Sequence, residues 1–335
     1  MMQFLKNINH WFWQQKRGFK LLLTFVFIPA GAWFFLRTPD TDFYAMHKKY
    51  GGSKAQYTNG KPNAPYSKAL HVHYRDEGNL AGAPIVFIHG SSASLHTWEG
   101  VVSALGDKYR LISYDQPGHG LTGPHPQDNY KASGMFEALD AVITELGIEK
   151  VVLVGNSMGG WVSWRYALKY PQRVKALVLI DAAGAPSDKA PPLNLGFRLV
   201  QNPITRPLTK FITPRPLIKK SLEQTVGDPS KINEKTVNLY WELLRYPGNR
   251  RATTLRTIAP RGIKYGSRLN EITVPTLILW GKKDQLIHAS DAELFESAIP
   301  NSQKIIYPNI GHIPMEEIPE QVAKDIDEFL RGIER

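Results

Sequence analysis

A serine flanked by glycines is the clearest candidate for covalent chemistry in this chain. Gly155-Asn156-Ser157-Met158-Gly159 follows an apolar run at 151–154 and precedes a helical pattern at 158–169. A serine at the tip of a sharp strand-to-helix turn is exposed and strained, and only small residues fit two positions away. The helix N-terminus also favours negative charge beside the serine. The pattern predicts Ser157 as a nucleophile, and the alternative is a tight glycine turn.

A serine hydroxyl needs a general base to become a nucleophile. His312 lies in Gly-His-Ile-Pro just after the last apolar run, and Asp284 follows the run before it. The chain order Ser, Asp, His is typical of a nucleophile on such a turn. We predict that His312 takes the serine proton and that Asp284 orients the imidazole. Asp181, which follows an earlier run, is a rival acid.

A third group of residues is a candidate oxyanion hole. His89-Gly90-Ser91-Ser92 follows the apolar run at 85–88. Backbone N–H groups in such a loop, together with the residue after the nucleophile, stabilise the oxyanion of acyl transfer. We predict Ser91 and Met158 as donors, with Ser92 as the second choice for the loop. His89 is expected to be structural.

The remaining chemistry-bearing residues give weaker signals. The sequence has no cysteine, which excludes disulfides and thiolate catalysis. No metal-binding spacing and no G-x-G-x-x-G fingerprint occur, so we expect neither a metal nor a cofactor. His288 and Asp291 are expected at the surface.

The elements that must position these residues alternate along the chain. Residues 69–75 alternate as in a strand, and short apolar runs, which suit strands buried on both faces of a parallel sheet, follow at 85–88, 109–114, 151–154, 176–180, 276–280 and 304–307. Helical patterns lie between them at 130–146, 158–169, 290–299 and 319–330. This alternation predicts an α/β fold with a mostly parallel, doubly wound sheet. Ligands bind such sheets at the carboxyl ends of the strands, where the candidate residues lie.

The alternation also suggests domain boundaries. We expect the core to comprise 67–186 and 270–335, with a helical cap inserted at 187–269. Residues 38–66 are polar and turn-rich, which is typical of a stalk leading into the domain. Residues 1–37 are expected to form a membrane anchor.

The N-terminal expectation rests on an uncharged apolar run at 21–36 that follows four basic residues. Such a segment predicts a single transmembrane helix with its basic end in the cytoplasm. The catalytic domain would then face the periplasm from the bacterial inner membrane. The alternatives are secretion after signal-peptide cleavage near Ala30-Gly31-Ala32, and a buried helix of a soluble protein.

The charge distribution is uneven. The chain carries a formal net charge of +11, and residues 187–268 contain 16 basic against 5 acidic residues. A basic segment can bind nucleic acid, anionic lipid or an anionic substrate, or be a solvated surface. No nucleic-acid motif accompanies it, so we expect no nucleic-acid partner and hypothesise that the cap contacts anionic lipid.

Six ordered motifs resemble those of the α/β-hydrolase superfamily, in particular bacterial lipase/esterase-like and meta-cleavage-product-hydrolase-like enzymes. They are VHYRDEG at 72–78, IVFIHGSS at 85–92, YDQPGHGLT at 114–122, GNSMGG at 155–160, ILWGKKD at 278–284 and GHIPMEE at 311–317. The resemblance implies the α/β-hydrolase fold and the triad Ser157, Asp284 and His312. It argues against dehalogenases and epoxide hydrolases, which have a nucleophilic aspartate where this chain has Ser157.

These observations predict a serine hydrolase that cleaves small-molecule or lipid-like carboxylic esters through an acyl-enzyme. The alternative reaction is carbon–carbon bond hydrolysis of the meta-cleavage-product type, which an exported location disfavours. A third possibility is a binding protein that kept the fold without catalysis. The sequence carries no signal for an oligomeric state.

Overall fold

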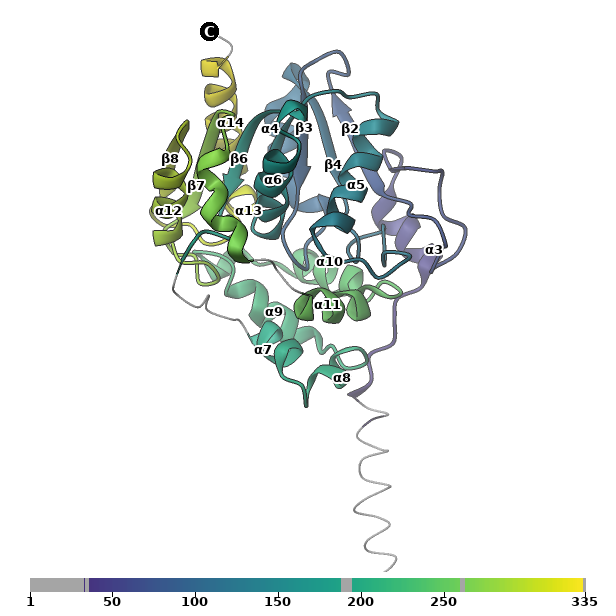
Figure 1. The fold of residues 1–335 in the computed structure, drawn as a ribbon. Helices are drawn as coiled ribbons and strands as arrows, with labels where there is room; N and C mark the ends of the chain where they lie inside the picture. Colours follow the sequence, from purple (N-terminus) through teal and green to yellow (C-terminus); the bar gives the residue numbers. More distant parts are fainter. Residues whose placement is uncertain (1–32, 34–35, 188–194, 260–262, 334–335) are drawn as a thin grey trace, which may run out of the picture.

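A computed structural model describes residues 33, 36–187, 195–259 and 263–333 (Figure 1). The apolar segment expected to anchor the chain lies almost entirely outside these residues. Within the described ranges, no helix combines the length and hydropathy that a bilayer crossing needs.

One eight-stranded sheet forms the centre of the molecule. Its strands are β1 (Gln56–Tyr57), β2 (His73–Gly78), β3 (Pro84–Ile88), β4 (Arg110–Tyr114), β5 (Val151–Asn156), β6 (Val174–Ile180), β7 (Thr276–Gly281) and β8 (Ser302–Tyr307). They lie in the order β1-β2-β4-β3-β5-β6-β7-β8. Strand β2 pairs in antiparallel fashion with both β1 and β4, and the remaining neighbours, from β4 through β3 to β8, pair in parallel. The mostly parallel sheet expected from the apolar runs is therefore confirmed.

Helices cover both faces of the sheet. The α-helices are α3 (Phe43–Met46), α4 (Glu99–Leu105), α5 (Ala132–Glu145), α6 (Met158–Lys169), α7 (Leu195–Gln201), α8 (Arg206–Thr209), α9 (Arg215–Glu223), α10 (Glu234–Leu244), α11 (Asn249–Ile258), α12 (Ser290–Ala298), α13 (Pro314–Glu317) and α14 (Pro319–Ile333). Alternate residues of β3 enter opposite cores: Val86 packs with residues of α5, α6 and α12, and Phe87 packs with residues of α4 and α14. Burial on both faces explains why the central strands, such as β3, β5 and β7, appear as continuous apolar runs.

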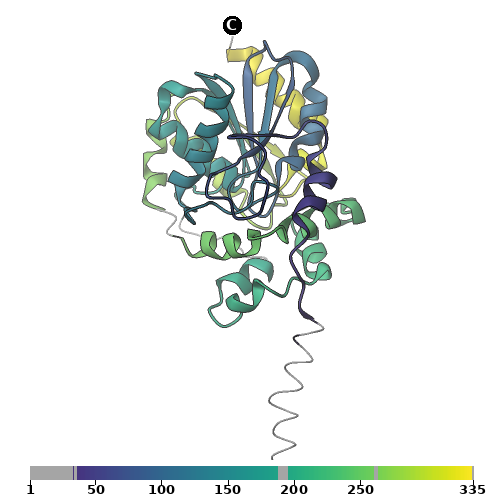
Figure 2. The ribbon, with the colours of Figure 1, turned by 90° about the vertical axis from the view of Figure 1, so that its right-hand side faces the viewer.

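The expected cap region contains α7 to α11, which lie together across one end of the sheet (Figures 1 and 2). Two of these helices, α10 and α11, correspond to helical patterns that the sequence shows near 236–244 and 250–257. The helices α7, α8 and α9 are shorter, and a proline lies in the first turn of α8 and of α9, which leaves little periodicity to recognise.

Residues 38–66, expected as a stalk, fold onto the cap. They contain α3, a π-helix at His47–Gly51 and β1. The Thr41 N–H donates to the carbonyl of Arg245 at 2.9 Å, and Arg250 pairs with Asp40 at 2.7 Å. Phe43 is buried against the same part of the cap. These contacts fix the cap against the start of the domain.

Candidate active site

The turn between β5 and α6 holds Ser157 in a strained conformation. Its φ is 54° and its ψ is −115°, a region that residues with a Cβ rarely occupy. A Cβ on Gly155 would collide with the carbonyl oxygen of Gly159, and a Cβ on Gly159 would collide with the carbonyl oxygen of Ile88. The two glycines are therefore required for the turn, as the sequence pattern indicated.

The loops after β7 and β8 bring Asp284 and His312 together. Nδ1 of His312 lies 2.7 Å from Oδ2 of Asp284, whose side chain is fully buried. The backbone N–H of His312 donates to the carbonyl of Thr225 in the cap at 2.7 Å. A carboxylate on Nδ1 leaves Nε2 as the basic nitrogen of the neutral ring.

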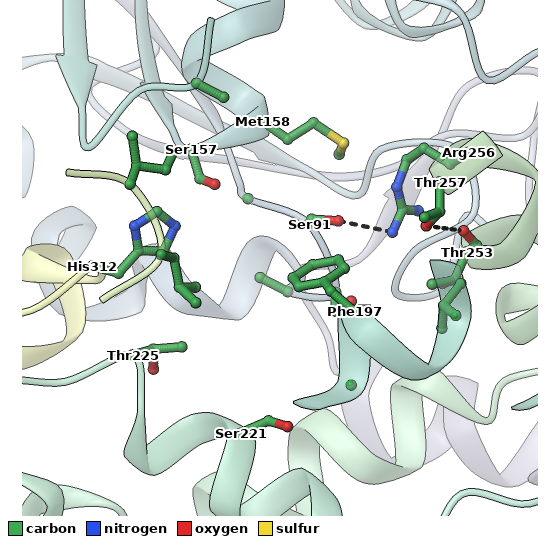
Figure 3. A pocket seen from close by; sticks show the side chains of 18 of the residues that line it. Ser91, Ser157, Met158, Phe197, Ser221, Thr225, Thr253, Arg256, Thr257 and His312 are labelled. Atoms are coloured by element: carbon green, nitrogen blue, oxygen red, sulfur yellow. Dashed lines mark hydrogen bonds between the residues drawn. The ribbon is translucent and has the colours of Figure 1, made fainter. Parts of the chain in front are cut away.

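Ser157 and His312 line the same cavity (Figure 3). No hydrogen bond joins their side chains in the described part of the chain. Such bonds are often long before substrate binds and tighten in the reacting complex. The structure therefore brings together the three residues predicted to be nucleophile, base and acid.

Asp181, the rival acid, lies beside this pair and does not replace Asp284. Its Oδ1 accepts the Gly281 N–H at 3.0 Å, and its other oxygen, Oδ2, is buried near the carboxylate of Asp284. Burial and the neighbouring carboxylate of Asp284 raise the pKa of Asp181 well above its usual range. The raised pKa favours the protonated form of Asp181 and so reduces the negative charge beside Asp284.

These three groups also have the composition of a small metal site, since ligand atoms of Asp181, Asp284 and His312 lie within 4.8 Å of one another. However, Nδ1 of His312 is already hydrogen-bonded to Asp284, and the pKa of Asp181 is shifted towards the protonated form. Metal ligation requires deprotonated groups. The donor set fits acid–base chemistry better than metal binding.

The predicted oxyanion residues Ser91, Ser92 and Met158 all line the cavity. Ser92 has a φ of 65°, so the loop after β3 is strained as well. The hydroxyl of Ser91 accepts a hydrogen bond from Nη2 of Arg256 at 2.9 Å. Arg256 comes from α11 and is 8% exposed, so this basic residue of the cap does not belong to a solvated surface.

Two buried residues missed by the sequence reasoning connect the loops. Nδ2 of Asn156 donates to the His312 carbonyl at 3.0 Å and to the Ile180 carbonyl at 3.2 Å. Glu317 accepts the Gly311 N–H at 2.7 Å. Asn156 is the second residue of the Gly-x-Ser-x-Gly pattern, but the pattern alone does not reveal its partners.

The other candidate residues have different surroundings. His89 accepts the Gln116 N–H at 3.0 Å, and burial lowers its pKa to about 4, so the neutral ring acts as a structural link. His288 is exposed at the edge of the cavity. The expectation that Asp291 lies at the surface is wrong: it is 8% exposed and lines the cavity. The first turn of α12 faces inward, which the sequence did not reveal.

The cavity has a volume of about 700 Å³ and lies between the core and the cap. Its wall is largely apolar and includes Trp161 and Trp164 from α6 and Phe197, Leu217 and Leu244 from the cap. Figure 3 shows Ser157 and His312 on one side of the cavity and Arg256 beside Ser91 on another. This volume and lining suit a substrate with an apolar chain.

Comparison with known proteins agrees with this architecture. The family model described as "alpha/beta hydrolase fold" matches residues 83–203 and 222–319, and the chain belongs to this family. Lipase 3 of Moraxella sp. (strain TA144) is 28% identical over 272 residues, which cover 78% of this chain and 82% of the relative.

Two further relatives carry a different reaction in their names. A 2-hydroxy-6-oxononadienedioate/2-hydroxy-6-oxononatrienedioate hydrolase of Paraburkholderia phymatum is 31% identical over 269 residues, covering 78% of this chain and 91% of the relative. A meta-cleavage product hydrolase of Pseudomonas fluorescens IP01 superposes with a TM-score of 0.68 at 23% identity, covering 81% and 98% of the two chains. Relatives of both kinds support a hydrolase.

Proposed function

We propose that this protein hydrolyses carboxylic esters through an acyl-enzyme on Ser157. The observation that carries the proposal is the 2.7 Å hydrogen bond between Asp284 and His312, because His312 lines the same apolar cavity as the strained Ser157. A nucleophile, a base and an orienting acid are the minimum set for serine-based acyl transfer.

In the proposed mechanism, Ser157 Oγ attacks the ester carbonyl while His312 Nε2 takes its proton. The backbone N–H groups of Ser91 and Met158 stabilise the oxyanion. The imidazolium then protonates the leaving alcohol, and the acyl group stays on Ser157. Water, deprotonated by His312, attacks this acyl-enzyme and releases the acid. Protons balance over the cycle, since each one taken by His312 is returned.

Asp181 supports this cycle through its raised pKa. Burial and the nearby carboxylate of Asp284 favour the neutral form of Asp181, so Asp284 supplies the negative charge that faces His312 when the imidazole becomes positively charged. Asp284 therefore remains the single acceptor for the Nδ1 proton and fixes the tautomer of the ring.

Carbon–carbon bond hydrolysis is the second candidate. It is supported by the 31% identical relative that is named for a dioate substrate. It is also supported by Arg256, since a buried guanidinium beside Ser91 can bind a carboxylate of such a substrate. The apolar wall and the lipase relative favour the ester reaction.

We also propose that the N-terminal segment is a single-pass anchor in the bacterial inner membrane, with the hydrolase domain in the periplasm. The support is the uncharged run at 21–36, preceded by four basic residues. Protease treatment of spheroplasts should digest the domain and leave a membrane-bound fragment of the N-terminus. A shortened soluble protein would instead indicate signal-peptide cleavage, and protection from protease would contradict the orientation.

The reaction is tested with p-nitrophenyl esters of increasing acyl length, using the full chain in detergent. Hydrolysis by the wild type, lost in Ser157→Ala, supports the ester proposal. If no ester is cleaved while a vinylogous 1,5-diketone acid is, the carbon–carbon proposal takes its place. A protein that cleaves neither and is not labelled by a fluorophosphonate would be a binding protein.

A further inference from the structure

The tip of the cap exposes large apolar side chains that the fold does not bury. Ile204 is 82% exposed, Leu208 47% and Phe211 46%, and all three lie in or beside α8. We call these three residues the cap tip. Figure 1 shows α8 at the end of the cap away from the sheet. Neighbouring exposed apolar residues on a folded domain mark a surface that contacts a partner or a membrane.

The cap tip continues into the first described residues of the chain. The rings of Trp33 and Phe211 are in edge contact with centroids 5.2 Å apart, and the Thr38 N–H donates to the carbonyl of Phe211 at 2.7 Å. Trp33 is 38% exposed and Leu36 54%. The apolar run of the N-terminus therefore ends beside the cap tip, which extends the apolar surface to two segments far apart in sequence.

The charge of the segment around the cap tip indicates what kind of partner the cap tip contacts. Residues 189–222 contain seven basic residues and no acidic residue. Arg215 and Lys219 pair with Glu234 of α10, whereas Arg37 and Lys220 are exposed and Lys210 is partly exposed. Apolar side chains flanked by basic residues match the interface of an anionic bilayer, where the apolar groups insert and the cations meet headgroups.

The same segment forms a wall of the cavity on its inner side. Phe197, Val200, Ile212 and Leu217 line the cavity, while the cap tip points outward. A bilayer against the tip would therefore be separated from the cavity only by this thin layer of helices. A second copy of the chain is a poorer occupant, because two segments without acidic residues would repel each other.

We propose that the cap tip docks on an anionic lipid surface and that the cavity receives its substrate from that surface. The proposal names the source of the substrate for the ester hydrolysis proposed above, and rests on it in that respect. It does not depend on whether the N-terminal segment spans the membrane. The substrate class that follows is an ester with an apolar chain held in a bilayer.

Insertion can be measured directly because the sequence contains no cysteine. Full-length Ile204→Cys and Leu208→Cys are labelled with the fluorophore NBD and mixed with vesicles of phosphatidylcholine and phosphatidylglycerol. Leu80→Cys is the matched control, since Leu80 is 62% exposed but lies in the loop before β3. We expect a blue shift and about twofold brighter emission at 204 and 208, reduced by 0.5 M salt, and no change at 80.

Equal responses at all three positions, or none at 204 and 208, would overturn the proposal. A blue shift that needs no vesicles and grows with protein concentration would indicate a second copy of the chain and would also overturn it.

Hydrolysis assays with soluble and vesicle-bound esters test the docking surface separately from the proposed reaction. The double variant Ile204→Asp/Leu208→Asp should hydrolyse soluble p-nitrophenyl butyrate like the wild type. It should cleave a long-chain ester in anionic vesicles about tenfold more slowly. If both activities are unchanged, the surface does not deliver substrate. If the wild type cleaves no ester but the labels still report insertion, the reaction is wrong and the docking surface stands.

Discussion

The two sides of the cavity are built in different ways. On the core side, Ser157, Asp284 and His312 follow the parallel strands β5, β7 and β8, so the strand positions fix their spacing. On the cap side, residues such as Phe197 and Leu217 lie on short helices whose residues are mostly partly exposed. The core determines which reaction is possible, and the cap determines which substrate reaches it.

Hydrogen bonds reinforce this difference. Asn156 ties the nucleophile turn to the His312 loop, and Glu317 holds the Gly311 N–H at the start of that loop. The cap contacts the periphery of this site, through the Thr225 carbonyl on the His312 N–H, the Gly227 N–H on Glu317 and Arg256 on Ser91. We therefore expect substitutions on the core side to reduce the rate for all substrates, and substitutions in the cap to change the ranking of substrates.

The largest effect is expected for Asp284→Asn. The amide cannot accept the Nδ1 proton in the same way, so His312 adopts the wrong tautomer, and kcat should fall by ~10⁴ for every ester. Steady-state kinetics with short and long esters measure this. A loss confined to long esters would contradict the assignment of the reaction to the core side.

A smaller and more selective effect is expected for Leu217→Trp in the cap. The larger side chain fills part of the apolar wall, so kcat/KM for long-chain esters should fall about tenfold, while acetate esters are spared. Leu80→Trp is the control, because Leu80 is exposed in the loop before β3 and lies outside both the cavity wall and the cap tip. Equal losses for short and long esters would show that the cap also supports the chemistry.

The smallest effect on rate is expected for Asp181→Asn, because the amide mimics the protonated carboxyl that burial favours. The raised pKa means that the folded state binds more protons than the unfolded state, so the free energy of unfolding falls as the pH rises above about 4. The Asp181→Asn substitution removes this pH-dependent fall in the free energy of unfolding. Its Tm relative to the wild type should therefore be higher at pH 8 than at pH 4, and a pH-independent difference would contradict the assignment.

The sequence predicted the core better than the cap for a physical reason. Strands buried on both faces must be apolar throughout, so β3 and β5 appear as plain runs, and α6 begins and ends at the predicted residues. The sequence shows little helical periodicity at α7 and α8, because these helices are short and contain or adjoin prolines.

Within the site, the sequence indicated which residues lie near the strand ends but not which of them touch. The bond from Asp284 to His312, with Asp181 as its neighbour, depends on the order of β6, β7 and β8 in the sheet. The inward orientation of Arg256 and Asp291 depends on how α11 and α12 pack, which is a property of the whole fold. No local pattern carries that information.

The central claim is that Ser157 is an acylated nucleophile. The most direct test incubates the full chain with a fluorophosphonate probe and then with p-nitrophenyl butyrate, comparing the wild type with Ser157→Ala. We predict that the wild type is labelled at Ser157, that labelling abolishes ester hydrolysis, and that the variant shows neither labelling nor hydrolysis. Undiminished hydrolysis by a correctly folded Ser157→Ala protein would contradict the account.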